Sequence, residues 1–167
     1  MKTVVTGGSG QLGSFTVRAL IDAGHDVLSL DRVRPAAALC ESWICDLTRA
    51  GDLYQAFKGA EAVIHLAADT RVGADWESTL KNNFISTYNV FEAAHQNGVR
   101  RLAFASRAGL LAPYPQDIQR TMEMLPRPES YYSISKVFGE NLGYMYSARF
   151  NIEVVCVRIG NFNPERD

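Results

Sequence analysis

Apolar and polar positions along the chain follow two repeating patterns. Short apolar runs predict buried strands, and longer stretches with apolar residues three or four positions apart predict helices. The predicted strands are residues 2–6, 26–31, 41–45, 62–66, 101–106 and 152–159. The predicted helices are residues 11–23, 50–57, 76–96 and 131–150. Strands that alternate with helices predict a doubly wound α/β fold of the Rossmann type. This fold has three layers, with a parallel sheet between two layers of helices, and the expected strand order is 3-2-1-4-5-6.

A glycine-rich turn, Thr6-Gly7-Gly8-Ser9-Gly10-Gln11-Leu12-Gly13, joins the first strand to the first helix. Gly7 permits a tight turn, Gly10 lets the backbone approach a pyrophosphate, and Gly13 lets the helix pack closely on the strand. The phosphates would lie at the helix N-terminus, next to Gln11 and Leu12, where free N–H groups and the helix dipole favour negative charge. The turn therefore predicts a dinucleotide site.

The end of the second strand predicts which dinucleotide is bound. Asp31 lies 18 residues after Gly13, near the position of the ribose-binding acid in such a unit. Its carboxylate can accept hydrogen bonds from both ribose hydroxyls and would repel the 2′-phosphate of NADP, which favours NAD. Arg32 and Arg34 weaken this preference, because a nearby arginine can hold a phosphate. The alternative interpretation of Asp31 is a turn residue that follows a strand.

Two polar residues fall inside apolar patterns. His65 lies within the apolar strand 62–66, where a hydrogen-bonded core histidine is a better interpretation than a catalytic one. Asn83 shares a helix face with Thr87 and Val90, so its side chain is expected to point inward.

Composition narrows the class of protein. The chain has 167 residues, which predicts a single domain over 1–167, with 47% hydrophobic residues, 21% charged residues and a net charge of -1. This balance predicts no nucleic acid partner and no membrane partner. Three cysteines without metal-ligand spacing predict reduced thiols in a cytoplasmic protein and no metal site. The first strand begins almost at Met1, so no signal peptide is expected.

Tyr132 and Lys136 lie four residues apart, on one face of the predicted helix 131–150. A free tyrosine has a pKa near 10, so acting as a base near pH 7 requires a shift of roughly 3 units, or about 4 kcal/mol. We expect Lys136 and a positively charged nicotinamide to lower the Tyr132 pKa. Tyr132 would then take the proton of a substrate hydroxyl while hydride leaves for the nicotinamide. Without other motifs, this pair is as easily an exposed aromatic and a solvated lysine.

Taken together, these motifs resemble the extended short-chain dehydrogenase/reductase family, the NAD-dependent epimerase/dehydratase group. The resemblance rests on the glycine spacing, Asp31, Asp46-Leu47, His65-Leu66-Ala67-Ala68, Asn83 and the Tyr132/Lys136 pair. It implies that Asp46 and Leu47 contact adenine and that Asn83 supports the active site. It also implies that NAD is bound by Leu66, Ala67, Ala68, Arg32 and Ile159, and that Lys136 binds the nicotinamide ribose.

Within this family the chain is most similar to uronate dehydrogenases. The similarity rests on Phe104-Ala105-Ser106, Tyr114-Pro115-Gln116, residues 132–142 and Arg158-Ile159-Gly160. It implies NAD-dependent oxidation of a hydroxyl on a sugar or uronic acid. A nucleotide-sugar epimerase or dehydratase shares the same motifs. A non-catalytic NAD-binding module or a truncated remnant is a third interpretation.

Two departures from the family pattern bear on activity. The family has two serines after the fifth strand, but here Ser106 is followed by Arg107, and adjacent strand residues should point to opposite faces. Ser106 could replace the orienting serine, and Arg107 could bind an anionic group or mark lost turnover. The chain also stops at Asp167, where the family's C-terminal substrate domain would begin.

The resemblance further implies a homodimer, built from the predicted helices 76–96 and 131–150. Apolar residues on these helices are expected to form its surface: Phe84, Phe91, Phe138 and Met145.

Overall fold

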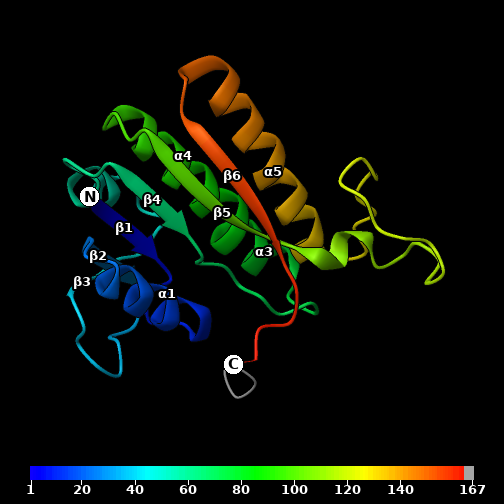
Figure 1. Cartoon of the computed structure of the whole chain (residues 1–167), viewed down its shortest axis with the longest axis horizontal. Helices are drawn as coiled ribbons and strands as arrows, with labels where there is room; N and C mark the ends of the chain where they lie inside the picture. Colours follow the sequence, from blue (N-terminus) through cyan, green and yellow to red (C-terminus); the bar gives the residue numbers. More distant parts are fainter. Residues whose placement is uncertain (164–167) are drawn as a thin grey trace.

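Six parallel strands form one sheet in the computed structural model, which describes residues 1–163. They are β1 Lys2–Thr6, β2 Asp26–Asp31, β3 Glu41–Ile44, β4 Ala62–His65, β5 Arg101–Arg107 and β6 Glu153–Ile159. Their order is β3-β2-β1-β4-β5-β6, and every neighbouring pair is parallel (Figure 1). The predicted doubly wound sheet is confirmed, strand order included.

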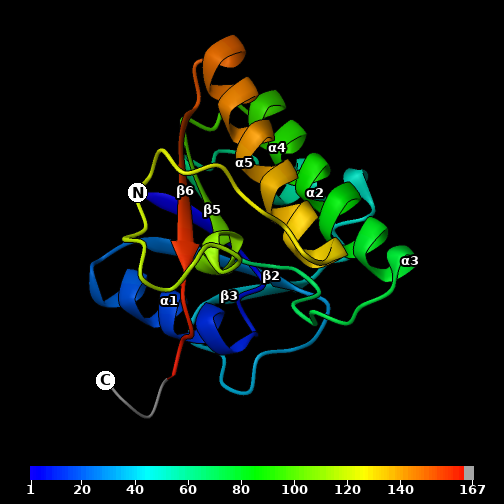
Figure 2. The same cartoon turned by 90° about the vertical axis from the view of Figure 1, so that its right-hand side faces the viewer.

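Helices lie on both faces of the sheet. They are α1 Gln11–Asp22, α2 Ala50–Ala56, α3 Trp76–Thr79, α4 Ser86–Gln96 and α5 Tyr131–Phe150, with a short 3-10 turn η2 Ala108–Leu111. On one face, Val17 of α1 packs with Val5 and Val27 of the sheet. On the other, α2, α4 and α5 join the larger core, which includes Phe91 and Tyr146 (Figure 2). The predicted three layers are therefore confirmed.

The carboxyl ends of all six strands lie along one edge of the sheet, because the strands are parallel. From β1 the chain moves first toward β2 and β3, and then crosses to β4 on the other side of β1. Such a reversal leaves a crevice beyond the strand ends, which is where open α/β sheets bind ligands. The topology thus places a site beside the turn that follows β1.

One predicted helix is interrupted. Residues 76–96 form α3, a π-helical segment η1 Leu80–Ile85, and α4. π-Helical segments are rare and frequently lie at functional sites. Within η1, Asn83 is 2% exposed, and its Oδ1 accepts a hydrogen bond from the Asp69 N–H at 2.7 Å. Its Nδ2 donates to the Asp69 carbonyl at 3.0 Å and to Ser135 Oγ at 3.1 Å, so Asn83 points inward as expected.

His65 is a core histidine, as the sequence indicated. It is 1% exposed, and its ring nitrogens lie 2.7 Å from Thr6 Oγ1 and 3.0 Å from Thr87 Oγ1. Burial, and to a smaller extent the charge of Lys136, lowers its pKa to about 3. The neutral ring therefore ties β4 to β1 and α4.

The four apolar residues expected on the surface of the predicted helices 76–96 and 131–150 are wholly or partly buried. Phe91 is fully buried in the core. Phe84 and Phe138 are half-buried, and their ring centroids lie 5.1 Å apart, so they join η1 to α5. Met145 packs against the core as well. The residues that these helices expose are others: Trp76, Ile85, Tyr88, Tyr131, Ile134 and Tyr144.

Replacing Asn83 should destabilise the chain, because two backbone groups of Asp69 lose their partner. We expect Asn83→Ala to lower the free energy of unfolding by about 2 kcal/mol in urea denaturation. The control is Asn141→Ala, since Asn141 is exposed and bonds only within α5. That change should cost less than about 0.5 kcal/mol. Equal losses for both variants would contradict the role given to Asn83.

His65 should make stability depend on pH. Its native pKa of about 3 lies below the ordinary value of 6.5, so the unfolded chain binds a proton that the native chain does not. The stabilisation is complete above pH 6.5 and is lost as the pH falls. Between pH 7 and pH 5 the loss should be about 2 kcal/mol. In His65→Gln, urea denaturation at both pH values should show a correspondingly smaller decline, and an unchanged decline would contradict a neutral native His65.

Candidate functional site

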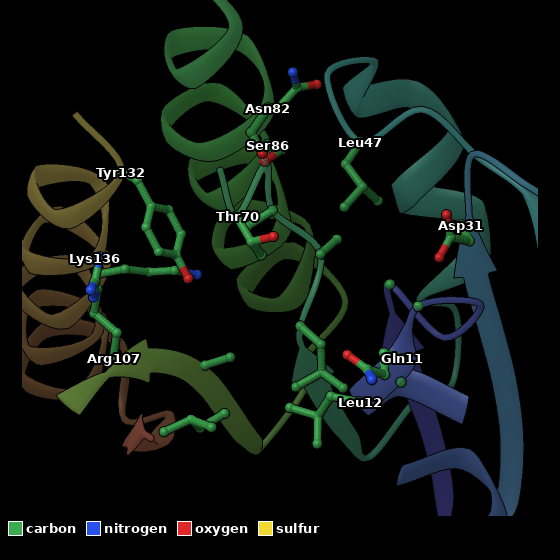
Figure 3. A pocket seen from close by; sticks show the side chains of 18 of the residues that line it. Gln11, Leu12, Asp31, Leu47, Thr70, Asn82, Ser86, Arg107, Tyr132 and Lys136 are labelled. Atoms are coloured by element: carbon green, nitrogen blue, oxygen red, sulfur yellow. Dashed lines mark hydrogen bonds between the residues drawn. The ribbon is translucent and has the colours of Figure 1, made fainter. Parts of the chain in front are cut away.

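A cavity of about 870 Å³ opens at the carboxyl edge of the sheet (Figure 3). This volume is typical of sites for small molecules and cofactors. The cavity brings together sequence-predicted residues from both halves of the sheet: Gly7, Gly10, Gln11, Leu12, Gly13, Asp31, Arg32, Asp46, Leu47, Leu66, Ala67, Ala68, Ser106, Tyr132, Lys136 and Ile159. Asn83 does not line it, and instead holds the backbone of Asp69 from behind.

The glycine turn is closely packed where the sequence requires glycine. Gly7 has φ of +77°, and a Cβ at this position would lie 2.6 Å from the backbone nitrogen of Ala67. A Cβ on Gly13 would overlap the carbonyl oxygen of Gly7. Helix α1 then starts at Gln11, and no side chain caps its first N–H groups. A glycine-rich turn that ends in uncapped N–H donors fits a pyrophosphate.

Asp31 is held in place at the end of β2. Its Oδ2 accepts a hydrogen bond from the Ser9 N–H at 3.0 Å, and its Oδ1 accepts one from the Val33 N–H at 3.3 Å. The neighbouring Arg32 donates from Nη1 to Asn82 Oδ1 at 2.9 Å. Arg32 thus joins the end of β2 to η1.

Asp46 and Leu47 follow β3 beside the same cavity. Asp46 Oδ1 accepts from the N–H and the hydroxyl of Thr48, at 3.0 and 2.9 Å, and these bonds lower the pKa of the carboxyl. The Leu47 carbonyl accepts from Asn89 Nδ2 at 2.9 Å. Both residues are therefore fixed by hydrogen bonds, Asp46 to its own turn and Leu47 to α4, rather than left in a free loop.

Tyr132 and Lys136 project from the first turns of α5. Lys136 is 4% exposed, and its Nζ lies 5.4 Å from the centre of the Tyr132 ring. Burial and, second, the charge of Arg107 lower the Lys136 pKa to about 8. Figure 3 shows these side chains gathered on one side of the cavity, across from Asp31.

We expected Lys136 to lower the pKa of Tyr132, but the structure gives that effect to Arg107. Burial raises the pKa of the Tyr132 phenol above its ordinary value of 10, and the cation that opposes this rise is Arg107. The guanidinium carbon of Arg107 lies 5.2 Å from the centre of the Tyr132 ring. Without a bound cofactor, the phenol is therefore protonated near neutral pH.

Ser106 and Arg107 both contact α5. Ser106 is 3% exposed, and its Oγ donates to Glu140 Oε1 at 2.6 Å. Arg107 ends β5 with an extended backbone, and its Nη1 donates to Ser133 Oγ at 3.2 Å, in the first turn of α5. The opposite directions expected of the two side chains stay a prediction. The hydroxyl of Ser106 therefore already donates its hydrogen bond to the carboxylate of Glu140.

Some lining residues were not identified from the sequence. Thr70 and Val72 lie on the segment after β4, and Ser86 begins α4. The segment lies there because Asn83 binds the backbone of Asp69, a contact across 14 residues of sequence. The ion pair of Glu140 with Arg158, at 2.8 Å, was also not expected.

Two other kinds of feature are absent from the described residues. Among residues 1–163, no group of three or more His, Cys, Asp and Glu side chains could hold a metal ion. In the same part of the chain, no helix has the length and apolar character that crossing a membrane requires.

Comparison with curated proteins finds sugar dehydrogenases. The L-arabinose 1-dehydrogenase (NAD(P)(+)) of Haloferax volcanii is 39% identical over 95% of this chain and 66% of its own length. The uronate dehydrogenase of Agrobacterium fabrum is 35% identical over 98% of this chain and 62% of its own length. The chain therefore spans about two thirds or less of these relatives.

Solved structures agree with this result. The uronate dehydrogenase from Agrobacterium tumefaciens superposes with a TM-score of 0.88 at 34% identity, over 98% of this chain and 62% of that one. The UDP-glucose 4-epimerase from Thermus thermophilus, solved in complex with NAD, has a TM-score of 0.91 at 29% identity, over 100% of this chain and 58% of that one. Finally, the family model described as NAD dependent epimerase/dehydratase matches residues 3–166, and the chain belongs to that family.

Proposed function

We propose that this chain binds NAD in the cavity at the carboxyl edge of the sheet. We further propose that its Tyr132/Lys136 pair removes the proton of a sugar or uronic acid hydroxyl during hydride transfer. One observation carries the proposal. The glycine-rich turn and Asp31 lie on one side of a cavity of about 870 Å³, and Tyr132 and Lys136 lie on the other.

The fit to NAD follows from the contacts of the first half of the site. The uncapped N-terminus of α1 would hold the pyrophosphate, and Asp31 would accept hydrogen bonds from the ribose hydroxyls. Asp46 and Leu47 would flank the adenine. Arg32 is bonded to Asn82, so the carboxylate of Asp31 is the charge offered to the ribose, which supports NAD over NADP.

The second half of the site supplies proton chemistry. When bound, NAD supplies the acceptor for hydride. Tyr132 would take the proton of the substrate hydroxyl at its Oη, a role that requires its raised pKa to fall. Lys136 and Arg107 are the nearby cations that favour the phenolate. Lys136 would also donate to the ribose next to the nicotinamide.

The substrate class is supported by the relatives. Their names describe dehydrogenases of uronates and L-arabinose, and a solved neighbour is a UDP-glucose 4-epimerase. Sugar oxidation is favoured because the L-arabinose 1-dehydrogenase and the uronate dehydrogenase reach 39% and 35% identity, whereas the UDP-glucose 4-epimerase from Thermus thermophilus reaches 29%. Epimerase or dehydratase activity on a nucleotide sugar is the alternative within the family.

A second candidate is a non-catalytic NAD-binding module. Ser106, the only serine left of the family's pair, gives its hydroxyl to Glu140 at 2.6 Å. The next position carries Arg107, which cannot accept a hydrogen bond from a substrate hydroxyl. Under this proposal NAD binds but no hydride is transferred.

A homodimer and a cytoplasmic setting complete the proposal. Helices α3 to α5 expose large apolar side chains, with Tyr88 49% and Tyr144 78% exposed. Exposed aromatic residues of this kind are enriched at protein interfaces. Three free cysteines, Cys40, Cys45 and Cys156, suit a reducing compartment.

Replacing Tyr132 should separate binding from chemistry. In Tyr132→Phe, NADH formation from glucuronate or galacturonate, followed by absorbance, should fall by about a hundredfold or more. NAD binding should remain unchanged, because the ring is kept and only the hydroxyl is lost. The matched control is Tyr131→Phe, since Tyr131 is 48% exposed and does not line the cavity.

Two outcomes would count against the proposed chemistry. Full NADH formation by Tyr132→Phe would exclude Tyr132 as the base. A wild-type chain that binds NAD but oxidises neither sugar acid would instead favour the non-catalytic module.

A further inference from the structure

Arg107 lines the cavity without an acidic partner among the described residues. It is half-buried, and its Nη1 bonds to the neutral hydroxyl of Ser133 at 3.2 Å. Among residues 1–163, the ion pairs of the chain do not include Arg107. Arg158 offers a contrast, since it places two nitrogens on Glu140 at 2.8 Å each. An arginine that lines a cavity without a carboxylate leaves its donors available to a ligand.

The charges that line the cavity differ between its two sides. The lining carboxylates, Asp31 and Asp46, lie at the end of β2 and just after β3, where Arg32 also lines the cavity. Arg107 and the buried Lys136 come from β5 and α5, on the other side of the cavity (Figure 3). The nearest acid on α5, Glu140, is already bound by Arg158 and Ser106. The tyrosine side of the cavity is therefore positive.

NAD does not balance this charge, if it binds as proposed above. Its pyrophosphate would lie at the N-terminus of α1, and its oxidised nicotinamide would add a further positive charge near Lys136. A positive region in a partly buried site is costly unless an anion approaches it. The remaining molecule that can bring an anion is the substrate.

We propose that Arg107 is a specificity-determining residue that binds an oxyanion of the substrate, a carboxylate or a phosphate group on a sugar. This inference rests on the proposed function, because it places the substrate beside Tyr132. A guanidinium offers paired N–H donors that match both oxyanions. Neutral sugars offer no such partner.

Binding of three probes to the chain saturated with NADH tests this inference. Calorimetry would compare glucuronate, glucose 6-phosphate and neutral glucose. The wild-type chain should bind at least one of the acidic probes roughly tenfold to a hundredfold more tightly than glucose, the range expected of a charged hydrogen bond. Whichever acid shows the preference identifies carboxylate or phosphate as the recognised group.

Three variants assign the preference to Arg107. Arg107→Met should remove it, and Arg107→Lys should keep part of it, because the charge remains without the fork of donors. Arg18→Met is the matched control, since Arg18 is exposed on α1 and does not line the cavity. It should leave the preference unchanged.

The outcomes separate this inference from the proposed function. NADH binding with no preference for an acidic probe, or with the same preference in Arg107→Met, would overturn the role of Arg107 and leave the cofactor site standing. No binding of the probes at all would overturn it in the same way. No NADH binding would overturn the proposed function, and this inference with it.

Discussion

The close approach of backbone to backbone at the glycine turn is the constraint on which the site depends. Gly7 leaves β1 at φ of +77° against Ala67, and Gly13 brings the first turn of α1 onto the carbonyl of Gly7. The uncapped N-terminus of α1 lines the cavity, where Gly10 leaves the backbone without a side chain. Farther along α1, Val17 packs against Val5 of β1 and Val27 of β2. The glycine turn therefore serves both the packing of the fold and the shape of the cavity.

The sheet then brings in groups that are distant in sequence. Parallel pairing puts the ends of β2, β3 and β5 at one edge, and α5 returns over β5. Buried hydrogen bonds fix this edge, with His65 between two threonines and Asn83 on the backbone of Asp69. Arg107 and Lys136 are thereby held near Tyr132, and the charge of Arg107 opposes the rise that burial causes in the Tyr132 pKa. These two cations lie on the tyrosine side of the cavity, and Asp31, Asp46 and Arg32 lie on the other side.

Much of this could be predicted from the sequence, because local patterns determine it. Hydrophobic periodicity predicted the six strands, and their alternation with helices predicted the strand order. Glycine spacing predicted the tight turn after β1. The contacts that depend on tertiary packing could not be predicted in this way. The π-helical break at Asn83 follows from its bonds to Asp69, 14 residues earlier. The raised pKa of Tyr132 follows from burial. The hydrogen bond from Ser106 to Glu140 follows from the packing of α5 on β5.

Calorimetric titration of the 167-residue chain with NAD tests the central claim most directly. We expect saturable binding to one site, and its loss in Gly13→Ala, whose Cβ would overlap the carbonyl of Gly7. Gly51→Ala is the matched control, because a Cβ on Gly51 meets no atom within 4 Å. That variant should bind NAD like the wild type. No binding by the folded wild-type chain, or unchanged binding by Gly13→Ala, would contradict the account.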